Sequence, residues 1–430
     1  MLQTFKNAWK IADLRSKLLF TIVIVVLYRI GSVIPVPFVN SAAIQAWFAD
    51  QAQGSVFAYF NMLSGSTFSQ ATLFALSISP YITASIVIQL LTIAIPALER
   101  LSKEGPEGRR KLTQITRYCT VALALITAFG YYTFLNASGL LVKNTGAFEA
   151  VVIIACYCAG ASIIMWLAEK INDHGIGNGI SIILFANIVV SLPTTIYEAF
   201  RKATASKNAA ELIFPIGMVA LLLAMIVFVV HVTNAERRLP VQYAKRQVGR
   251  RMYGGQNTYI PMKLNMSGVM PIIFASSIAS IPATINLMTG NKATGIWKTI
   301  LDFFSQTSPV YMVIYFVLII AFSYFYLAIS FNPVEVANNL KNNGGSVPGI
   351  RPGKPTVDYI TKILGRITLI GAIFLGIVAA LPLLVGIINQ NYAGLAFGGS
   401  SLLILVSVAL ETTKEIEAQM TMRHYKGFLE

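Results

Sequence analysis

Charged residues are scarce in this chain of 430 residues. Asp, Glu, Lys and Arg make up 12% of the sequence and hydrophobic residues 55%, whereas a soluble domain carries about 25% charged residues. So few charges leave too little polar surface to cover a water-soluble globule of this size. The composition therefore excludes an ordinary soluble protein and indicates a membrane protein.

Cysteine and histidine are also rare, with three of each. The cysteines, Cys119, Cys156 and Cys158, are odd in number and lie in apolar runs, which excludes a disulfide framework. Cys156 and Cys158 point away from each other on a helix, so a shared metal is not expected. The histidines match no zinc or catalytic spacing. We predict packing thiols and no metal site.

Carboxylates are absent from the apolar interior, where Arg29 is the one charged residue well away from the end of an apolar run. Coupled transporters usually need ionisable groups along the substrate path, so a secondary solute transporter is disfavoured, and a purely structural scaffold is the other alternative. For Arg29 itself, structural packing is favoured over a direct role.

Glycine-rich motifs give no support for nucleotide binding. No Lys-Ser/Thr pair follows the glycines of His174-Gly175-Ile176-Gly177-Asn178-Gly179, and the stretch 105–111 lacks P-loop spacing. We therefore predict no cofactor and no enzymatic activity.

What the chain has in abundance is long apolar runs. Each spans the roughly 20 residues that a membrane helix needs, and backbone groups in lipid must bond within the segment. The sequence therefore predicts an all-α multi-span protein, its first helix retained rather than cleaved as a signal peptide. The ten predicted spans are 18–37, 72–95, 117–136, 149–168, 180–197, 212–232, 268–288, 309–331, 364–388 and 396–411.

The few basic residues orient these spans. With the N-terminus in the cytoplasm, 26 Lys and Arg lie on the cytoplasmic side and 6 on the opposite side, a strong positive-inside bias. Both termini are therefore predicted to be cytoplasmic, the N-terminal tail being 1–17 and the C-terminal tail 412–430. Eleven of the 26 fall in two long loops, 233–267 and 332–363, which we interpret as docking surfaces.

The spans divide evenly along the chain. Five lie in 18–200 and five in 201–411, and an odd number per half is the arithmetic of an inverted repeat. The external connection 38–71 carries no Lys or Arg and includes a short, glycine-interrupted apolar stretch at 60–66. That stretch is too short to span, so we expect it to re-enter the membrane where protein shields its backbone.

Eight motifs, in order along this frame, resemble the SecY family, the channel-forming subunit of the bacterial protein translocase. They are Arg29-Ile30-Gly31-Ser32 with Ile34-Pro35-Val36-Pro37, Phe60-Asn61-Met62-Leu63-Ser64-Gly65, Pro80-Tyr81-Ile82-Thr83-Ala84-Ser85-Ile86, Glu104-Gly105 with Gly108-Arg109-Arg110-Lys111, Gly175-Ile176-Gly177-Asn178-Gly179-Ile180-Ser181, Tyr243-Ala244-Lys245-Arg246-Gln247, Gly249-Arg250-Arg251 and Pro348-Gly349-Ile350-Arg351-Pro352-Gly353. The resemblance covers nearly the whole chain.

The resemblance implies ten helices in two five-helix inverted-repeat halves around a central pore. The pore would be closed by a ring of apolar side chains, since an apolar neck dewets and opposes ion flow. Leu184 replaces the isoleucine usual in the family. By motif position the ring residues are Ile78, Ile82, Ile180, Leu184, Ile273 and Ile404.

Two further sites follow from the resemblance. An external plug at about 57–70 would seat under the ring, and it includes Phe60, Asn61, Met62, Leu63, Ser64 and Gly65. A lateral gate between the second and seventh spans would release signal sequences to lipid. Its candidate residues are Ser79, Thr83, Ser276 and Ser280, although hydroxyls are also ordinary helix-packing residues.

The resemblance also supplies partners. The two basic loops would dock the motor ATPase SecA and the ribosome, with Arg250, Arg251 and Arg351 as the main contacts, because guanidinium groups bind both carboxylates and phosphates. The remaining expected partners are SecE, SecG, preprotein signal sequences and membrane lipid. The expected function is passive translocation of unfolded preproteins across the bacterial cytoplasmic membrane and lateral insertion of membrane proteins into it.

Overall fold

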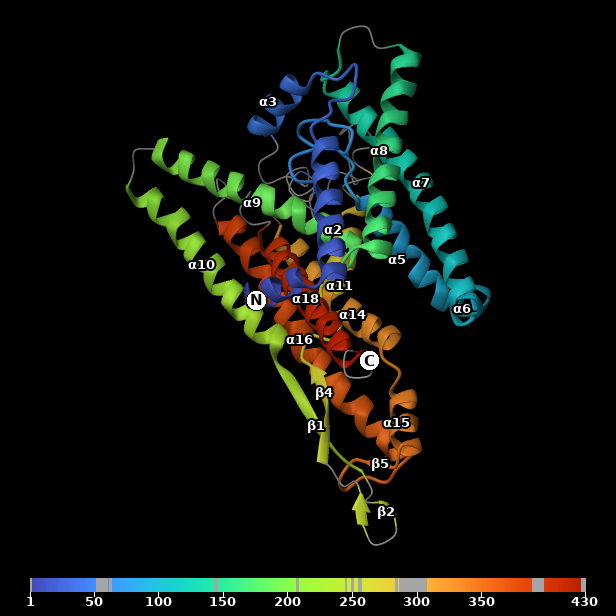
Figure 1. Ribbon diagram of the computed structural model, residues 1–430. Coiled ribbons are helices and arrows are strands. Elements are labelled where there is room, and N and C mark those ends of the chain that lie inside the picture. The colour runs from blue at the N-terminus through green and yellow to red at the C-terminus, as the bar shows by residue number, and fades with distance from the viewer. Residues whose placement is uncertain are drawn as a thin grey trace.

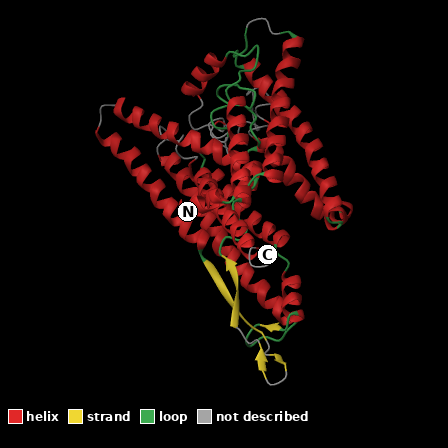
Figure 2. Cartoon of the chain, in the orientation of Figure 1, coloured by secondary structure: helices red, strands yellow, loops and turns green. Residues whose placement is uncertain are grey.

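The computed structural model is an elongated helical body with a small β-structured projection at one end (Figures 1 and 2). It describes residues 2–51, 61, 64–142, 146–205, 209–243, 246–248, 251–253, 257–282, 285, 308–388 and 398–426. Each of the ten predicted spans overlaps a helix in these ranges, although α5 begins at Ser79, seven residues into the second predicted span, and α11 covers only Met270–Ala279 of the seventh.

In its described residues, the first half of the chain forms three short helices and a group of long ones. The amphipathic α1 precedes the first span, and α3 lies in the external connection. The helices are α1 (Leu2–Lys10), α2 (Ala12–Gly31), α3 (Ser41–Gln51), α5 (Ser79–Ala94), α6 (Pro96–Lys103), α7 (Pro106–Ala137), α8 (Ala147–His174) and α9 (Gly179–Ala205).

Proline sets several of these boundaries. Pro80 and Pro106 lie in the first turns of α5 and α7, where a missing N–H costs nothing. Pro96 separates α5 from α6, and the two helices meet at a bend of 102°. The polar helix α6 therefore turns away from the second span instead of prolonging it.

The second half begins with α10 (Ala209–Asn234) and continues into a β-hairpin within the first basic loop. Its helices are α10, α11 (Met270–Ala279), α14 (Pro309–Ser330), α15 (Pro333–Asn342), α16 (Lys354–Ile388) and α18 (Gly398–Lys426). Its strands are β1 (Glu236–Tyr243), β2 (Arg246–Val248), β3 (Arg251–Tyr253), β4 (Asn257–Lys263) and β5 (Gly345–Ser346).

The strands join two loops that lie about 100 residues apart. β1 pairs antiparallel with β4 from Glu236 and Lys263 to Gln242 and Asn257, and β5 pairs antiparallel with the other edge of β1. The sheet order is β4-β1-β5, and β2 and β3 form a separate two-stranded ribbon. The two predicted docking loops are thus one structural unit, which projects beyond the helices in Figure 2.

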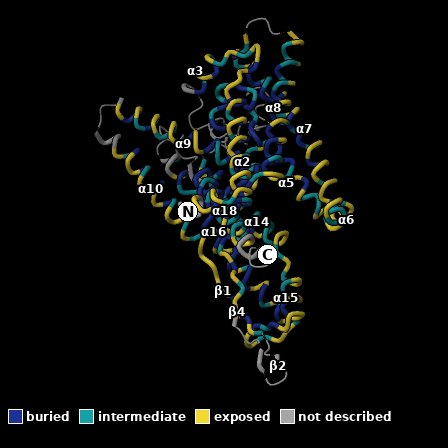
Figure 3. Tube along the Cα trace, in the orientation of Figure 1, coloured by how far each residue is buried: buried dark blue, intermediate teal, exposed yellow. Residues whose placement is uncertain are grey.

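Apolar surface on the outer helices supports a lipid environment. Exposed positions run along α7 and α10 in Figure 3, and those of α10 include Ile213, Leu223 and Val227, which are 60 to 70% exposed. In the described residues, six helices are long and apolar enough to span a membrane, and the bent pair α5 and α6 adds a seventh. α11 is a shorter apolar helix.

Candidate functional site

The six residues of the predicted ring come together in the structure. They belong to α5, α9, α11 and α18, with Ile78 at the N-terminal cap of α5. Ile78, Ile82, Leu184, Ile273 and Ile404 are at most 8% exposed and lie in one hydrophobic cluster, and the half-buried Ile180 packs against it. The predicted ring residues, drawn from both halves of the chain, therefore belong to or pack against one buried hydrophobic cluster.

Helical periodicity explains why two of these helices contribute pairs. Ile78 and Ile82 are four residues apart, as are Ile180 and Leu184, so each pair lies on one face of its helix. Each of these two helices therefore contributes two aliphatic side chains to the same hydrophobic cluster.

Of the predicted plug, the structure describes Asn61 and residues 64–70. These residues form a compact turn, called the plug turn below, that precedes Ile78 in the chain. Asn61 organises it, since its side-chain oxygen accepts from the Ser69 amide at 2.9 Å and its carbonyl accepts from the Ser66 amide at 2.8 Å. Ser64 is buried, and its hydroxyl accepts from the Phe68 amide at 3.1 Å. Phe60, Met62 and Leu63 lie outside the described residues.

Two tyrosines hold the C-terminal end of this turn. The hydroxyl of Tyr131 on α7 donates to the Phe68 carbonyl at 2.7 Å, and that of Tyr157 on α8 donates to the Ala71 carbonyl at 3.5 Å. The Phe68 ring packs against Tyr131 and Phe48, with centroids 4.6 and 5.6 Å apart. Nothing in the sequence singles out these two tyrosines, because a tyrosine in an apolar helix is typical of a packing residue.

Arg29, whose role the sequence left open, reaches from α2 to α9. Its guanidinium donates to the main-chain carbonyl of Ala186, and one guanidinium nitrogen lies beside Gly65 of the plug turn. This placement brings the charge inside the first span next to the predicted plug.

The predicted lateral gate lies where α5 meets α11, since these two helices contact each other. Thr83 donates to the Ser79 carbonyl at 3.1 Å, Ser276 to the Ile273 carbonyl at 2.9 Å and Ser280 to the Ser277 carbonyl at 2.7 Å. These bonds all stay within one helix. None of these three bonds links α5 to α11.

The docking unit has its own apolar base. Leu239, Val241 and Met262 of the hairpin pack with Leu340 of α15 and Ile360 of α16 in one cluster. This base packs the hairpin against α15 and α16 of the second loop.

Of the three predicted docking arginines, Arg351 is the one whose side chain the structure describes. It is exposed in the turn between β5 and α16, and the Thr356 hydroxyl donates to its carbonyl at 2.8 Å. Positive φ angles at Gly349 and Gly353 shape this turn, which suits residues without a Cβ. Arg251 lies on β3, and Arg250 lies outside the described residues.

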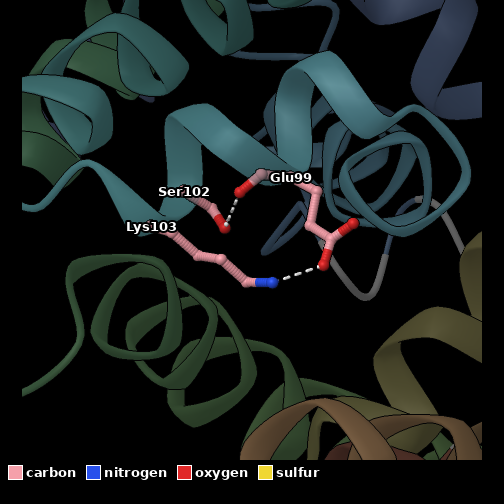
Figure 4. A network of polar contacts seen from close by, with 3 residues as sticks. All are labelled: Glu99, Ser102 and Lys103. Carbon is pink, nitrogen blue, oxygen red and sulfur yellow. Dashed lines mark hydrogen bonds and ion pairs between the residues drawn. The ribbon is translucent and has the colours of Figure 1, made fainter.

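A second polar surface lies on α6. Lys103 pairs with Glu99 at 2.6 Å, and the Ser102 hydroxyl donates to the Glu99 carbonyl at 2.9 Å (Figure 4). The bond from Lys103 lowers the pKa of Glu99 below its usual value. Such an exposed pair contributes little to stability, so α6 reads as a solvated face.

One buried carboxylate accompanies the spans. Glu169 on α8 pairs with Arg117 on α7 at 2.8 Å, with a second bond at 2.9 Å. The bidentate pair ties the two helices together at the ends of their predicted spans. Among the residues that the structure describes, no group of three His, Cys, Asp or Glu side chains is arranged to hold a metal ion.

Comparisons with known proteins agree on one family. The SecY family model matches residues 72–413. The chain is 46% identical to protein translocase subunit SecY of Streptomyces coelicolor and 44% identical to that of Bacillus subtilis, with 100% of both chains covered in each case.

Solved structures share the fold at lower identity. One match is a SecY structure, with a TM-score of 0.68 at 19% identity over 94% of this chain and 92% of that one. In that protein the plug domain stabilises the closed state of the channel. Sec61 from a canine ribosome-channel complex matches with a TM-score of 0.63 at 18% identity over the same shares. From the family model and the full-length relatives, this chain belongs to the SecY family of protein translocase subunits.

Proposed function

We propose that the chain forms a passive, protein-conducting pore whose constriction is the six-residue aliphatic ring. The chain is a SecY-family membrane protein, and the members of that family are subunits of translocation channels. The observation that carries the proposal is that six aliphatic residues from four helices belong to or pack against one buried hydrophobic cluster. Flexible aliphatic chains exclude water when they touch and yield around an extended polypeptide of any sequence.

The turn that includes Asn61, Ser64 and Gly65 is proposed to be the plug. It runs directly into the residues before Ile78, and its hydrogen bonds are mostly made within the turn. A segment that is satisfied internally leaves its seat at lower cost than one bonded throughout to its surroundings. Its tyrosine anchors lie at the C-terminal end, so the N-terminal part is the part proposed to move.

The seam between α5 and α11 is proposed to open toward lipid. Its support is the direct contact of these helices and the placement of two ring residues, Ile82 and Ile273, on them. Because the hydroxyls of Thr83 and Ser276 bond within their own helices, separating the helices leaves these hydroxyls paired. Signal sequences would leave the pore through this seam.

The joined basic loops are proposed to dock SecA and the ribosome, with Arg250, Arg251 and Arg351 as contacts. Support comes from the sheet that unites the loops and from the exposed Arg351 turn. SecE and SecG are the proposed companion subunits. The positive-inside bias supports a bacterial cytoplasmic membrane with both termini in the cytoplasm.

Proteoliposomes test the function directly. Vesicles that contain this chain with SecE, supplied with SecA and ATP, should import a preprotein with a signal sequence. Vesicles without this chain are the control. If the vesicles fail to import the preprotein and instead take up a solute together with an ion, the proposed channel function is wrong and the chain is a secondary transporter.

A further inference from the structure

Arg29 occupies an unusual position for a cation. It lies two residues before the C-terminal end of α2 and is half-buried. A charge in a membrane helix is costly unless its donors find partners. Its guanidinium finds one in the Ala186 carbonyl, 157 residues away on α9.

The plug turn passes through the space beside this contact. Gly65 has a φ of +66°, and a Cβ built on it would lie 3.1 Å from a guanidinium nitrogen of Arg29 and 3.0 Å from the side-chain oxygen of Asn187. The turn therefore packs against both side chains at its one left-handed glycine. A larger residue at position 65 would push directly on them.

Asn187 continues the connection to the ring. Its amide donates to the Ser77 hydroxyl at 3.3 Å in a buried environment, and Ser77 directly precedes Ile78. Tyr28, next to Arg29, stacks on Phe74 with ring centroids 5.4 Å apart. The α2 helix, the plug turn, α9 and the start of α5 thus meet at one place.

We propose that Arg29, Gly65, Asn187 and Ser77 form a plug latch that holds the channel closed, with Arg29 as its positioning residue. The inference rests on the proposed function of the plug. In the closed state the guanidinium clamps α2 to α9 and walls in the turn at Gly65. The amide of Asn187 bonds to Ser77, the residue before Ile78. Departure of the plug and widening of the ring therefore break the same set of contacts.

The central test replaces Arg29 in the complete translocase in planar bilayers. Arg29→Gln should raise resting ion conductance about tenfold and allow translocation of a preprotein with a defective signal sequence, because a charge-assisted bond to a partly buried carbonyl is lost. Arg29→Lys keeps a cation that can reach the carbonyl and should restore most of the seal. Arg15→Gln, an exposed arginine of the same helix, is the matched control and should leave conductance unchanged.

A second variant approaches the latch from the plug. Gly65→Ala introduces the Cβ that meets Arg29 and Asn187, so it should produce the same leak even if Arg29→Gln fails to accumulate. Combining the two should give no more leak than the worse single variant, because both break the same contact. Additive leaks, or tight channels in both folded variants, would overturn the latch.

Deleting residues 60–65 separates failure of the latch from failure of the plug. If the deletion leaks and the folded Arg29→Gln channel is tight and selective, the plug stands and the latch falls. If the deletion is itself tight, the plug assignment falls and the latch falls with it.

Discussion

The hydroxyl of Tyr131 donates a 2.7 Å hydrogen bond to the main-chain carbonyl of Phe68. This bond crosses from the third span to the end of the plug turn and is buried on both sides. It fixes the C-terminal end of the turn to α7.

Tyr131→Phe removes this bond and leaves the Phe68 carbonyl buried without its partner. We expect a loss of about 1–3 kcal/mol of stability, seen as a lower Tm in detergent, and a higher resting conductance from a loosened plug. Tyr157→Phe is the matched control, since its bond is 3.5 Å long and its removal should cost less. Equal effects of the two variants would contradict a special role for Tyr131.

Ring substitutions should change conductance before they change stability. Ile78→Ser or Ile273→Ser places a hydroxyl in the aliphatic layer and should raise resting ion conductance, because the layer then wets more readily. Ile126→Ser, at a 48% exposed position of α7, is the control and should leave conductance unchanged. Bilayer recordings measure both, and a tight Ile78→Ser channel would remove Ile78 from the ring.

Arg351→Glu should impair SecA-driven translocation while the protein still inserts and folds. The substitution reverses the charge of an exposed side chain in a glycine-shaped turn, so the loss is one of docking. Lys362→Glu makes the same charge reversal at an exposed position of α16 and should have a smaller effect. SecA binding to proteoliposomes separates the two, and unchanged binding by Arg351→Glu would refute the contact.

Gly345→Val should disconnect the two basic loops. A Cβ at Gly345 would lie 3.0 Å from the Tyr243 ring and 3.3 Å from Val241, so a branched side chain forces β5 away from β1. We expect faster proteolysis of both loops and weaker SecA binding. Gly344→Asn is the control, because its Cβ meets nothing within 4 Å and asparagine tolerates the positive φ.

The sequence predicted the helices well because lipid demands long apolar runs. It placed the second span at 72–95, but α5 begins at Ser79. The residues before α5 include the mostly apolar stretch 72–78, yet they form turns. Their φ angles are positive at Ser66, Ala71 and Ser77. Hydropathy cannot distinguish an apolar helix from an apolar turn that protein shields.

Polar helices and strands were harder to predict. Apolar patterning ends the last span at 411, whereas α18 continues to Lys426, because a helix extends into water without change of backbone. The pairing of β1 with β5 depends on residues a hundred positions apart, and no local pattern reveals it. The same limit hid the meeting of Arg29 with Ala186.

The sheet that unites β1 and β5 has a mechanical consequence. It makes the two basic loops a single attachment point on the second half of the chain. The plug turn and the tyrosines that bond to it belong to the first half. Among the described residues, the two halves contact each other where α9 meets α10 and α18, where α5 meets α11 and where α1 meets α18, so a force applied to the basic loops passes through these contacts before it reaches the plug turn. Any partner bound to one loop would therefore also load the other, and the force would pass to the first half of the chain at these contacts.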